Sequence, residues 1–241
     1  TRHADHPENF LKDYEGVCVT DGYQVYHKLA KEKGDLTVAG CWAHARRRYE
    51  EAVKALPAKS RKSSLAWQAL EQINMIYHVD NTLKELTPEE RKKRRQDSVK
   101  PLVEAYFAWV KEKKKDGRIA EKSKTGKGLS YSLNQEEYLK VFLENGNVPL
   151  DNNAAERAIR NFCIGRKNWV IIDTIRGAQS SAMIYSIAET AKANHLKPYE
   201  YFEYLLEEIP KHMDDKDLSF CEDLLPWSPN LPEKCRKTEK K

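Results

Sequence analysis

The sequence has 241 residues, of which 40% are hydrophobic and 33% are charged, and its formal net charge at pH 7 is +5. This length fits one large domain or two small ones, and the composition is typical of a globular protein with polar helices. No apolar run is long enough to cross a bilayer and no signal-peptide pattern opens the chain, so we expect neither a membrane span nor secretion. Because the chain begins at Thr1 instead of Met, we also expect it to be a piece of a longer protein.

The positive charge is concentrated in the middle of the chain. The segment from Lys84 to Gly128 contains 15 basic and 8 acidic residues, a net charge of +7, whereas the remainder has 27 basic and 29 acidic residues, a net charge of −2. Such a segment indicates either a polyanionic partner such as nucleic acid or, more commonly, a solvated helix face.

The cysteines do not form a metal-binding or disulfide pattern. Cys41 and His44 have the spacing of metal ligands, but no second pair accompanies them, so the pattern does not favour a structural zinc site. We expect free thiols in a reducing cytoplasm. The five cysteines are Cys18, Cys41, Cys163, Cys221 and Cys235.

Two short strands and a helix are predicted in the first 56 residues. The β-rich segment 17–20 ends at Asp21 and Gly22, and residues 36–40 form a second strand. The Asp-Gly pair is equally compatible with a tight hairpin turn and with the end of a buried strand that leads into a helix. Residues 42–56 have one apolar helix face. The other face carries His44, Arg47 and Arg48, which either hold phosphates or are ordinary surface charges.

The middle of the sequence is predicted to be helical. We expect a linker at 57–64, a long amphipathic helix at 65–86, and a helix that starts with Thr87 as its cap and Pro88 in its first turn. The glycines near 126–128 predict a flexible patch, and residues 134–143 predict a further helix. Residues 57–128 therefore look like a helical insertion within an α/β domain.

The stretch from Pro149 to Arg160 predicts the start of a helix. Asn153 and Glu156 have the spacing of an N-cap and the third helical residue, and Glu156 and Arg160 are four residues apart. From this geometry, a capping box with a salt bridge is the commoner interpretation of Glu156, and a metal-binding carboxylate is the alternative.

The last third of the chain is predicted to hold a basic turn, an apolar strand and two helices. The turn covers residues 165–168, the strand follows it, and the helices cover 178–194 and 198–209. An acidic linker at 211–223, an apolar segment at 224–227 and a disordered Lys-rich tail at 228–241 complete the chain.

Five motifs occur in an order that resembles a known family. They are TDGYQVY at 20–26, CWAHARRRY at 41–49, LDNNAAERAIR at 150–160, GRKNW at 165–169 and LLPW at 224–227. Together they resemble the C-terminal half of the bacterial transposases of the insertion sequence sixty-six family. The resemblance covers the chain from Thr1 to about residue 227.

The resemblance implies a mostly helical α/β protein with a partial RNase H-like fold and a DDE carboxylate triad. Asp21 would be the second Asp, at the end of a strand, and Glu156 would be the Glu, on the helix after the insertion. The first Asp and the first strands would lie in a segment before Thr1, so we expect the chain alone to be inactive. The implied regions are 1–56 with the second Asp, 57–128 as the insertion, 129–175 with the Glu helix and a strand, 176–227 as C-terminal helices, and the tail.

The implied activity is metal-dependent cleavage and transfer of DNA strands during transposition of an insertion sequence. Two Mg²⁺ or Mn²⁺ ions, about 3.5–4 Å apart, would bind the carboxylates, because hard cations prefer oxygen ligands. Basic residues would hold DNA phosphates in a salt-dependent and largely sequence-independent way. These residues would be His44, Arg47, Arg48, Arg157, Arg160, Arg166 and Lys167.

The resemblance also implies partners and a location. The partners would be the ends of the element, the target DNA and further copies of the protein on DNA, with accessory proteins of the element as further candidates and no membrane. The protein would act in the bacterial cytoplasm at the nucleoid. The alternative function is a catalytically inactive DNA-binding or assembly module, such as the remnant of a degenerate transposase.

Overall fold

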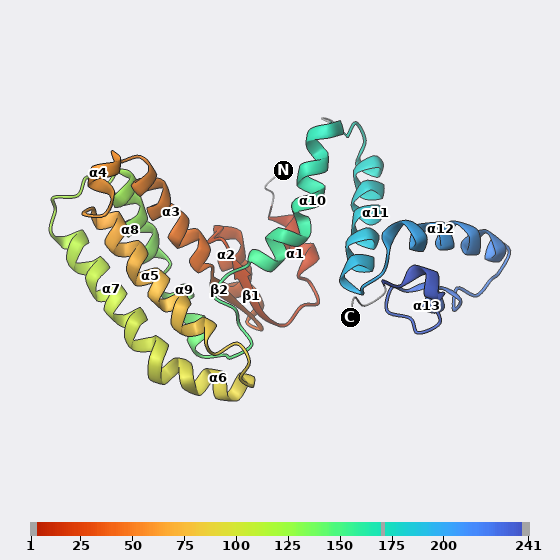
Figure 1. Cartoon of the computed structure of the whole chain (residues 1–241), viewed down its shortest axis with the longest axis horizontal. Helices are drawn as coiled ribbons and strands as arrows, with labels where there is room; N and C mark the ends of the chain where they lie inside the picture. Colours follow the sequence, from red (N-terminus) through yellow and green to blue (C-terminus); the bar gives the residue numbers. More distant parts are fainter. Residues whose placement is uncertain (1–3, 170–171, 238–241) are drawn as a thin grey trace. The chain divides into compact units, whose positions relative to one another are not determined.

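The computed structural model describes residues 4–169 and 172–237, and the side chains of residues 166–169 are not among those described. The chain divides into two compact units, Thr1–Ala154 and Ala155–Lys241 (Figure 1). Each unit has its own hydrophobic core, so we describe each by itself.

The first unit contains a two-stranded parallel sheet. Strand β1 (Gly16–Thr20) pairs with β2 (Leu36–Gly40) in a register that places Gly16 opposite Leu36 and Thr20 opposite Gly40. Helix α2 (Gln24–Lys33) connects them, as a parallel pair requires a crossover. The strand-to-helix interpretation of Asp21 and Gly22 is therefore confirmed, and the hairpin does not form.

Helices form the larger part of the first unit. They are α1 (Asp5–Phe10), α3 (Trp42–Lys54), α4 (Ala58–Arg61), α5 (Leu65–Asn81), α6 (Pro88–Arg94), α7 (Lys100–Lys115), α8 (Lys124–Asn134) and α9 (Glu136–Lys140), with a π-helical segment (Arg95–Val99) between α6 and α7 and a 3₁₀ turn (Val141–Leu143) after α9. Helices α3, α5, α7 and α8 lie side by side and pack on one another (Figure 1).

A single core joins these helices to the sheet. Trp42 is fully buried, its ring contacts those of Tyr106 and Phe107 from α7, and its indole N–H donates to the carbonyl of Leu139 over 2.9 Å. Val17 and Val19 of β1 pack against the same cluster. Fully burying a side chain such as that of Phe107 contributes roughly 1.5–3 kcal/mol to the free energy of unfolding. The segment expected as an insertion thus shares its core with the strands that it follows.

The structure confirms the predicted start of α6 and corrects two predictions nearby. Thr87 and Glu90 form a capping box, and Pro88 is in the first turn. The segment predicted as a linker contains the short helix α4. The predicted flexible patch is wrong, because Gly126 and Gly128 are buried in α8. They allow close packing there: a Cβ on Gly128 would lie 2.8 Å from the Tyr49 ring.

The second unit is built from helices. It contains most of α10 (Asn153–Trp169), then α11 (Ile175–Ala193), α12 (Pro198–Glu208), a 3₁₀ turn (Ile209–His212), the short α13 (Cys221–Leu224) and a 3₁₀ turn (Glu233–Cys235). The rings of Phe162 on α10 and Tyr185 on α11 have centroids 5.4 Å apart, and these two helices run side by side (Figure 1).

Three predictions for the C-terminal third need correction. The basic segment 165–168 is not a turn but the last part of α10, and Val170 and Ile171, in the predicted strand, lie outside the described residues. The tail is ordered up to residue 237, because Leu231 and Cys235 are buried in the core of the unit. In the apolar segment 224–227, Leu224 is buried but Trp227 is 63% exposed.

The fold class is thus α/β and mostly helical, as expected. In the part of the chain that the structure describes, no helix is both long and apolar enough to cross a membrane.

Candidate functional site

Asp21 lies directly after β1, where the two parallel strands end. Its carboxylate is exposed, and Oδ1 accepts a hydrogen bond from the backbone N–H of Tyr23 over 3.0 Å. Gly22 has φ +87°, a left-handed conformation that glycine adopts without strain, and α2 begins two residues later. This tight strand-to-helix turn presents the carboxylate at the carboxyl edge of the sheet.

Helix α8 fixes the same turn from a distant part of the sequence. The Tyr131 hydroxyl donates a hydrogen bond of 2.9 Å to the backbone carbonyl of Asp21. Burial, together with the nearby Cys41 and Asp21, raises the pKa of Tyr131 to about 12. The phenol is therefore protonated at neutral pH and can hold this hydrogen bond.

A cavity of about 640 Å³ opens beside Asp21 within the first unit. It is bordered by the β1–α2 turn, by α3 and by the end of α8 with the start of α9. The lining residues are Asp21, Gly22, Tyr23, Gln24, His27, Arg48, Tyr131, Asn134, Gln135 and Tyr138. Of these, sequence reasoning had selected Asp21 and Arg48. The contribution of α8 was not predicted because the glycines at 126–128 predict a flexible segment, and the helix predicted at 134–143 carries no local signal of a site.

The basic face of α3 divides between two cavities. Arg48 is exposed, lines the Asp21 cavity, and its guanidinium carbon lies 5.4 Å from the centre of the Tyr131 ring. Arg47 lies 3.4 Å from the His44 ring nitrogen Nε2 and lines a second cavity of about 390 Å³ with Asp151 and Asn153. The structure thus brings one predicted cation, Arg48, to Asp21.

The segment that leads to Glu156 is anchored at the same edge of the sheet. The backbone N–H of Trp42, two residues after the end of β2, donates to the carbonyl of Leu150 over 2.9 Å. Asp151 accepts hydrogen bonds from the Tyr77 hydroxyl over 3.0 Å and from the Asn153 N–H over 3.1 Å. These bonds fix the chain at the point where α10 begins.

The predicted cap of α10 is one residue too late. The helix already includes Asn153, so Asn152 precedes it and Glu156 is the fourth helical residue, still within the first turn. The Asp151 carboxylate accepts the Asn153 N–H in an Asx turn that leads into the helix.

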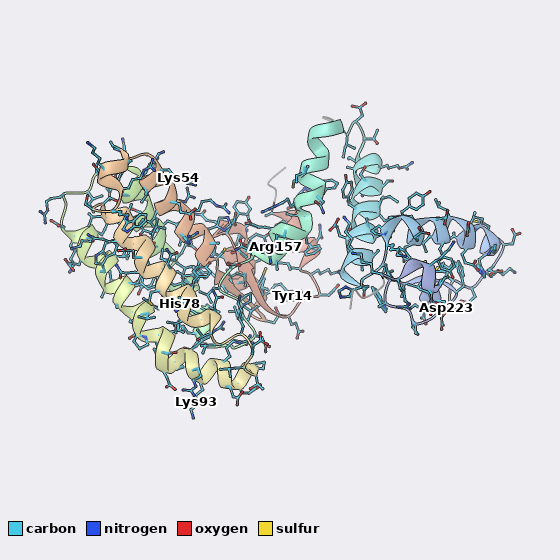
Figure 2. The ribbon with its side chains drawn as sticks, in the orientation of Figure 1. Tyr14, Lys54, His78, Lys93, Arg157 and Asp223 are labelled. Carbon is cyan, nitrogen blue, oxygen red and sulfur yellow. The ribbon has the colours of Figure 1, made fainter. Side chains whose placement is uncertain are left out.

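The remaining predicted residues lie on α10. Glu156 is half-buried, whereas Arg157 and Arg160 are exposed, and Figure 2 shows Arg157 on this helix. Arg166 and Lys167 are on the last turns of α10, but their side chains lie outside those described. Asp21 belongs to the first unit and Glu156 to the second, so their pairing stays a prediction.

Much of the basic charge of the segment 84–128 has structural partners. Arg91 donates to four backbone carbonyls around the α5–α6 connection, among them those of Leu83 and Gly146. Arg95 is buried against Asp80. Lys93 on α6 is exposed (Figure 2). The charge run therefore includes structural arginines as well as a solvated face.

The cysteine analysis is consistent with the structure. All five cysteines are free thiols, and burial raises the pKa of Cys41. No group of three or more His, Cys, Asp or Glu residues that could hold a metal ion occurs among the described residues.

Comparisons with known proteins identify the relatives of this chain. A family model described as "Transposase IS66 family" matches residues 1–180, and a model described as "IS66 C-terminal element" matches residues 186–227. The "Uncharacterized protein y4hP" of Sinorhizobium fredii is 30% identical over 236 residues, which cover 94% of this chain and 42% of the relative. The "Uncharacterized protein y4jD" of the same organism is 28% identical, with coverages of 95% and 44%.

No solved structure matches this chain. The chain spans less than half the length of the curated relatives it matches. The transposase family model covers 180 of the 241 residues of this chain, a range that includes motifs described above. The chain therefore belongs to the IS66 transposase family.

Proposed function

We propose that this chain supplies two metal-binding carboxylates, Asp21 and Glu156, to a transposase that cleaves and joins DNA strands. The observation that carries the proposal is the position of Asp21 in a member of this family: an exposed carboxylate at the carboxyl end of a parallel strand. An RNase H-like arrangement would use that edge of the sheet, and a third carboxylate would come from outside residues 1–241.

The donors present fit a hard divalent cation. The Asp21 Oδ1 accepts the Tyr23 N–H, and among the described residues Oδ2 has no hydrogen-bond partner, so it is open to a cation. Magnesium and manganese prefer such carboxylate oxygens. Asp21 and Glu156 would be the ligands that this chain contributes, and bound ions would activate the attacking hydroxyl and stabilise the leaving oxygen.

The neighbouring groups support a DNA substrate. Arg48 lines the Asp21 cavity and would hold a phosphate of the strand close to the carboxylate. The anchored segment from Leu150 to Asn153 starts the helix of Glu156 at the carboxyl edge of the sheet. Arg157 and Arg160 would hold phosphates further along the DNA. Self-association on DNA and accessory proteins of the element stay predictions.

The test uses the full-length protein, Mg²⁺ or Mn²⁺, and DNA that carries the ends of the element. We expect Asp21→Asn and Glu156→Gln each to lower the rate of strand cleavage by roughly a hundredfold or more, because a lost ligand removes several kcal/mol of charge stabilisation. DNA binding in a mobility-shift assay should remain, since Asn and Gln preserve the shape of each side chain.

The matched control is Glu144→Gln, which removes a carboxylate that hydrogen-bonds only to Gln96 among the described residues and should leave cleavage unchanged. Full cleavage by Glu156→Gln would contradict the catalytic assignment. A wild-type protein that binds the DNA ends without cleaving them in either metal would instead support the inactive binding module.

A further inference from the structure

The cavity beside Asp21 has features that the carboxylate chemistry leaves unexplained. Its volume of about 640 Å³ is within the range of pockets that enclose small ligands, roughly 300–1,000 Å³. The residues that line it indicate what it holds.

The wall of the cavity combines aromatic rings with a cation. Tyr23, Tyr131 and Tyr138 come from three different elements and are each half-buried. Arg48 stands at the same wall, over the Tyr131 ring. Aromatic rings beside a guanidinium form the surface that binds single-stranded nucleic acid, because bases stack on the rings and phosphates pair with the cation.

The wall is also polar behind its surface. The Oε1 of Gln135 is buried without a hydrogen-bond partner among the described residues, and the His27 and Tyr138 ring centroids are 3.8 Å apart. His27 and Gln135 therefore place polar groups at the same wall as the rings, which suits a polar ligand. A base offers hydrogen-bonding edges as well as an apolar face.

We propose that this cavity receives one unstacked nucleotide of the DNA strand, with its base against the tyrosine rings and its phosphate at Arg48. This inference rests on the proposed function, because it places that nucleotide next to the strand on which Asp21 acts. Tyr131 has a second part in it, as a positioning residue that holds the backbone of Asp21 through its hydroxyl.

The experiment separates base contacts from phosphate contacts. Full-length protein without divalent metal is titrated with a short single-stranded oligonucleotide and with an abasic oligonucleotide of the same length, and fluorescence anisotropy gives both dissociation constants. We expect the abasic strand to bind at least about fivefold more weakly, which is the lower end of the stacking contribution of one base.

Variants assign this ratio to the cavity. Tyr138→Leu and Tyr23→Leu should each lower the ratio towards one, whereas Tyr138→Phe, which keeps the ring, should preserve it. Arg48→Gln should weaken both strands alike and reduce the dependence of binding on salt. The matched control is Tyr199→Leu in the second unit, where the ring is 77% exposed and outside the cavity, and the ratio should not change.

Two results would overturn the inference: equal affinities of the wild type for the two strands, or a ratio unchanged in both Tyr138→Leu and Tyr23→Leu with native circular dichroism spectra. Glu156→Gln separates this inference from the proposed function, since it should keep the ratio while losing cleavage. If the wild-type protein binds the two strands equally but still cleaves DNA with metal, only the inference about the cavity is rejected. If the wild-type protein prefers the strand with bases but Glu156→Gln leaves cleavage unchanged, only the catalytic assignment is rejected.

Discussion

Arg95 shows how one buried side chain determines the path of the chain towards the candidate site. Only 2% of its side chain is exposed, and its Nε lies 2.7 Å from the Asp80 Oδ1. Its Nη1 donates to the carbonyls of Phe142, Asn145 and Val148 over 2.8–3.0 Å. One guanidinium therefore holds the loop that leads to the start of α10.

Replacing Arg95 should destabilise the first unit severely. Arg95→Met leaves the Asp80 carboxylate buried without its cation and three carbonyls without donors, so we expect the free energy of unfolding to fall by about 3–5 kcal/mol. Urea denaturation followed by circular dichroism measures this change. The control is Arg118→Ala, which breaks an exposed pair with Asp116 and should not shift the midpoint. A loss with Arg95→Met no larger than with Arg118→Ala would show that the pair is not structural.

The sequence could not distinguish this arginine from its neighbours. Arg91 to Arg95 form a basic run that is compatible with nucleic-acid binding, and the burial of Arg95 depends on Asp80 and on carbonyls up to 53 residues away. Asp21 was selected through the family resemblance, because its local Asp-Gly pair fits a hairpin turn and a strand end equally well. Tyr131 and Tyr138, which line the cavity beside Asp21, come from a distant segment of the sequence and were not predicted.

At the scale of elements, α8 shows where local signals and packing disagree. Its glycines predict flexibility, yet Gly128 faces the Tyr49 ring and Gly126 lies against the backbone at Ala120. Tyr49, Tyr106 and Ser132 are joined by hydrogen bonds of 2.7–3.2 Å beneath α8. The glycines thus let α8 pack closely against its neighbours. This packing depends on residues that are distant in the sequence, so local signals do not predict it.

This packing predicts the sign of a substitution. Alanine is favoured over glycine in a helix by about 1 kcal/mol, but overpacking a core costs about 1–3 kcal/mol. Because a Cβ at position 128 would lie 2.8 Å from Tyr49, we expect Gly128→Ala to lower the melting temperature. Lys127→Ala, on the exposed face of the same helix, is the control and should leave it unchanged or slightly raised. A stabilised Gly128→Ala protein would show that α8 does not pack so closely.

Local signals predicted other elements well. The strands were predicted from short β-rich segments, the helix at α3 from apolar periodicity, and the start of α6 at Thr87 from its cap residues. The C-terminal tail was predicted to be disordered because it is rich in lysine. Leu231 and Cys235 nevertheless anchor it in a core with Leu196 and Tyr201, through contacts that local composition does not encode.

At the scale of the whole molecule, the order of the motifs carries the functional assignment. The family follows from the match of the family model over residues 1–180, while the division at Ala154 separates the two proposed carboxylates by unit. Asp21 is fixed by its own sheet and by α8, and the chain that leads into α10 is held within the first unit by bonds of Leu150 and Asp151. The proposed metal site therefore requires Asp21 of the first unit and Glu156 of the second to come together when DNA and metal are bound.

The distance between the two carboxylates tests this requirement most directly. A structure of the full-length protein with DNA and Mg²⁺ should place oxygens of Asp21 and Glu156 about 2.0–2.1 Å from ions that lie about 3.5–4 Å apart. Asp21 and Glu156 carboxylates separated by more than about 10 Å in that complex, too far to share a pair of such ions, would contradict the account.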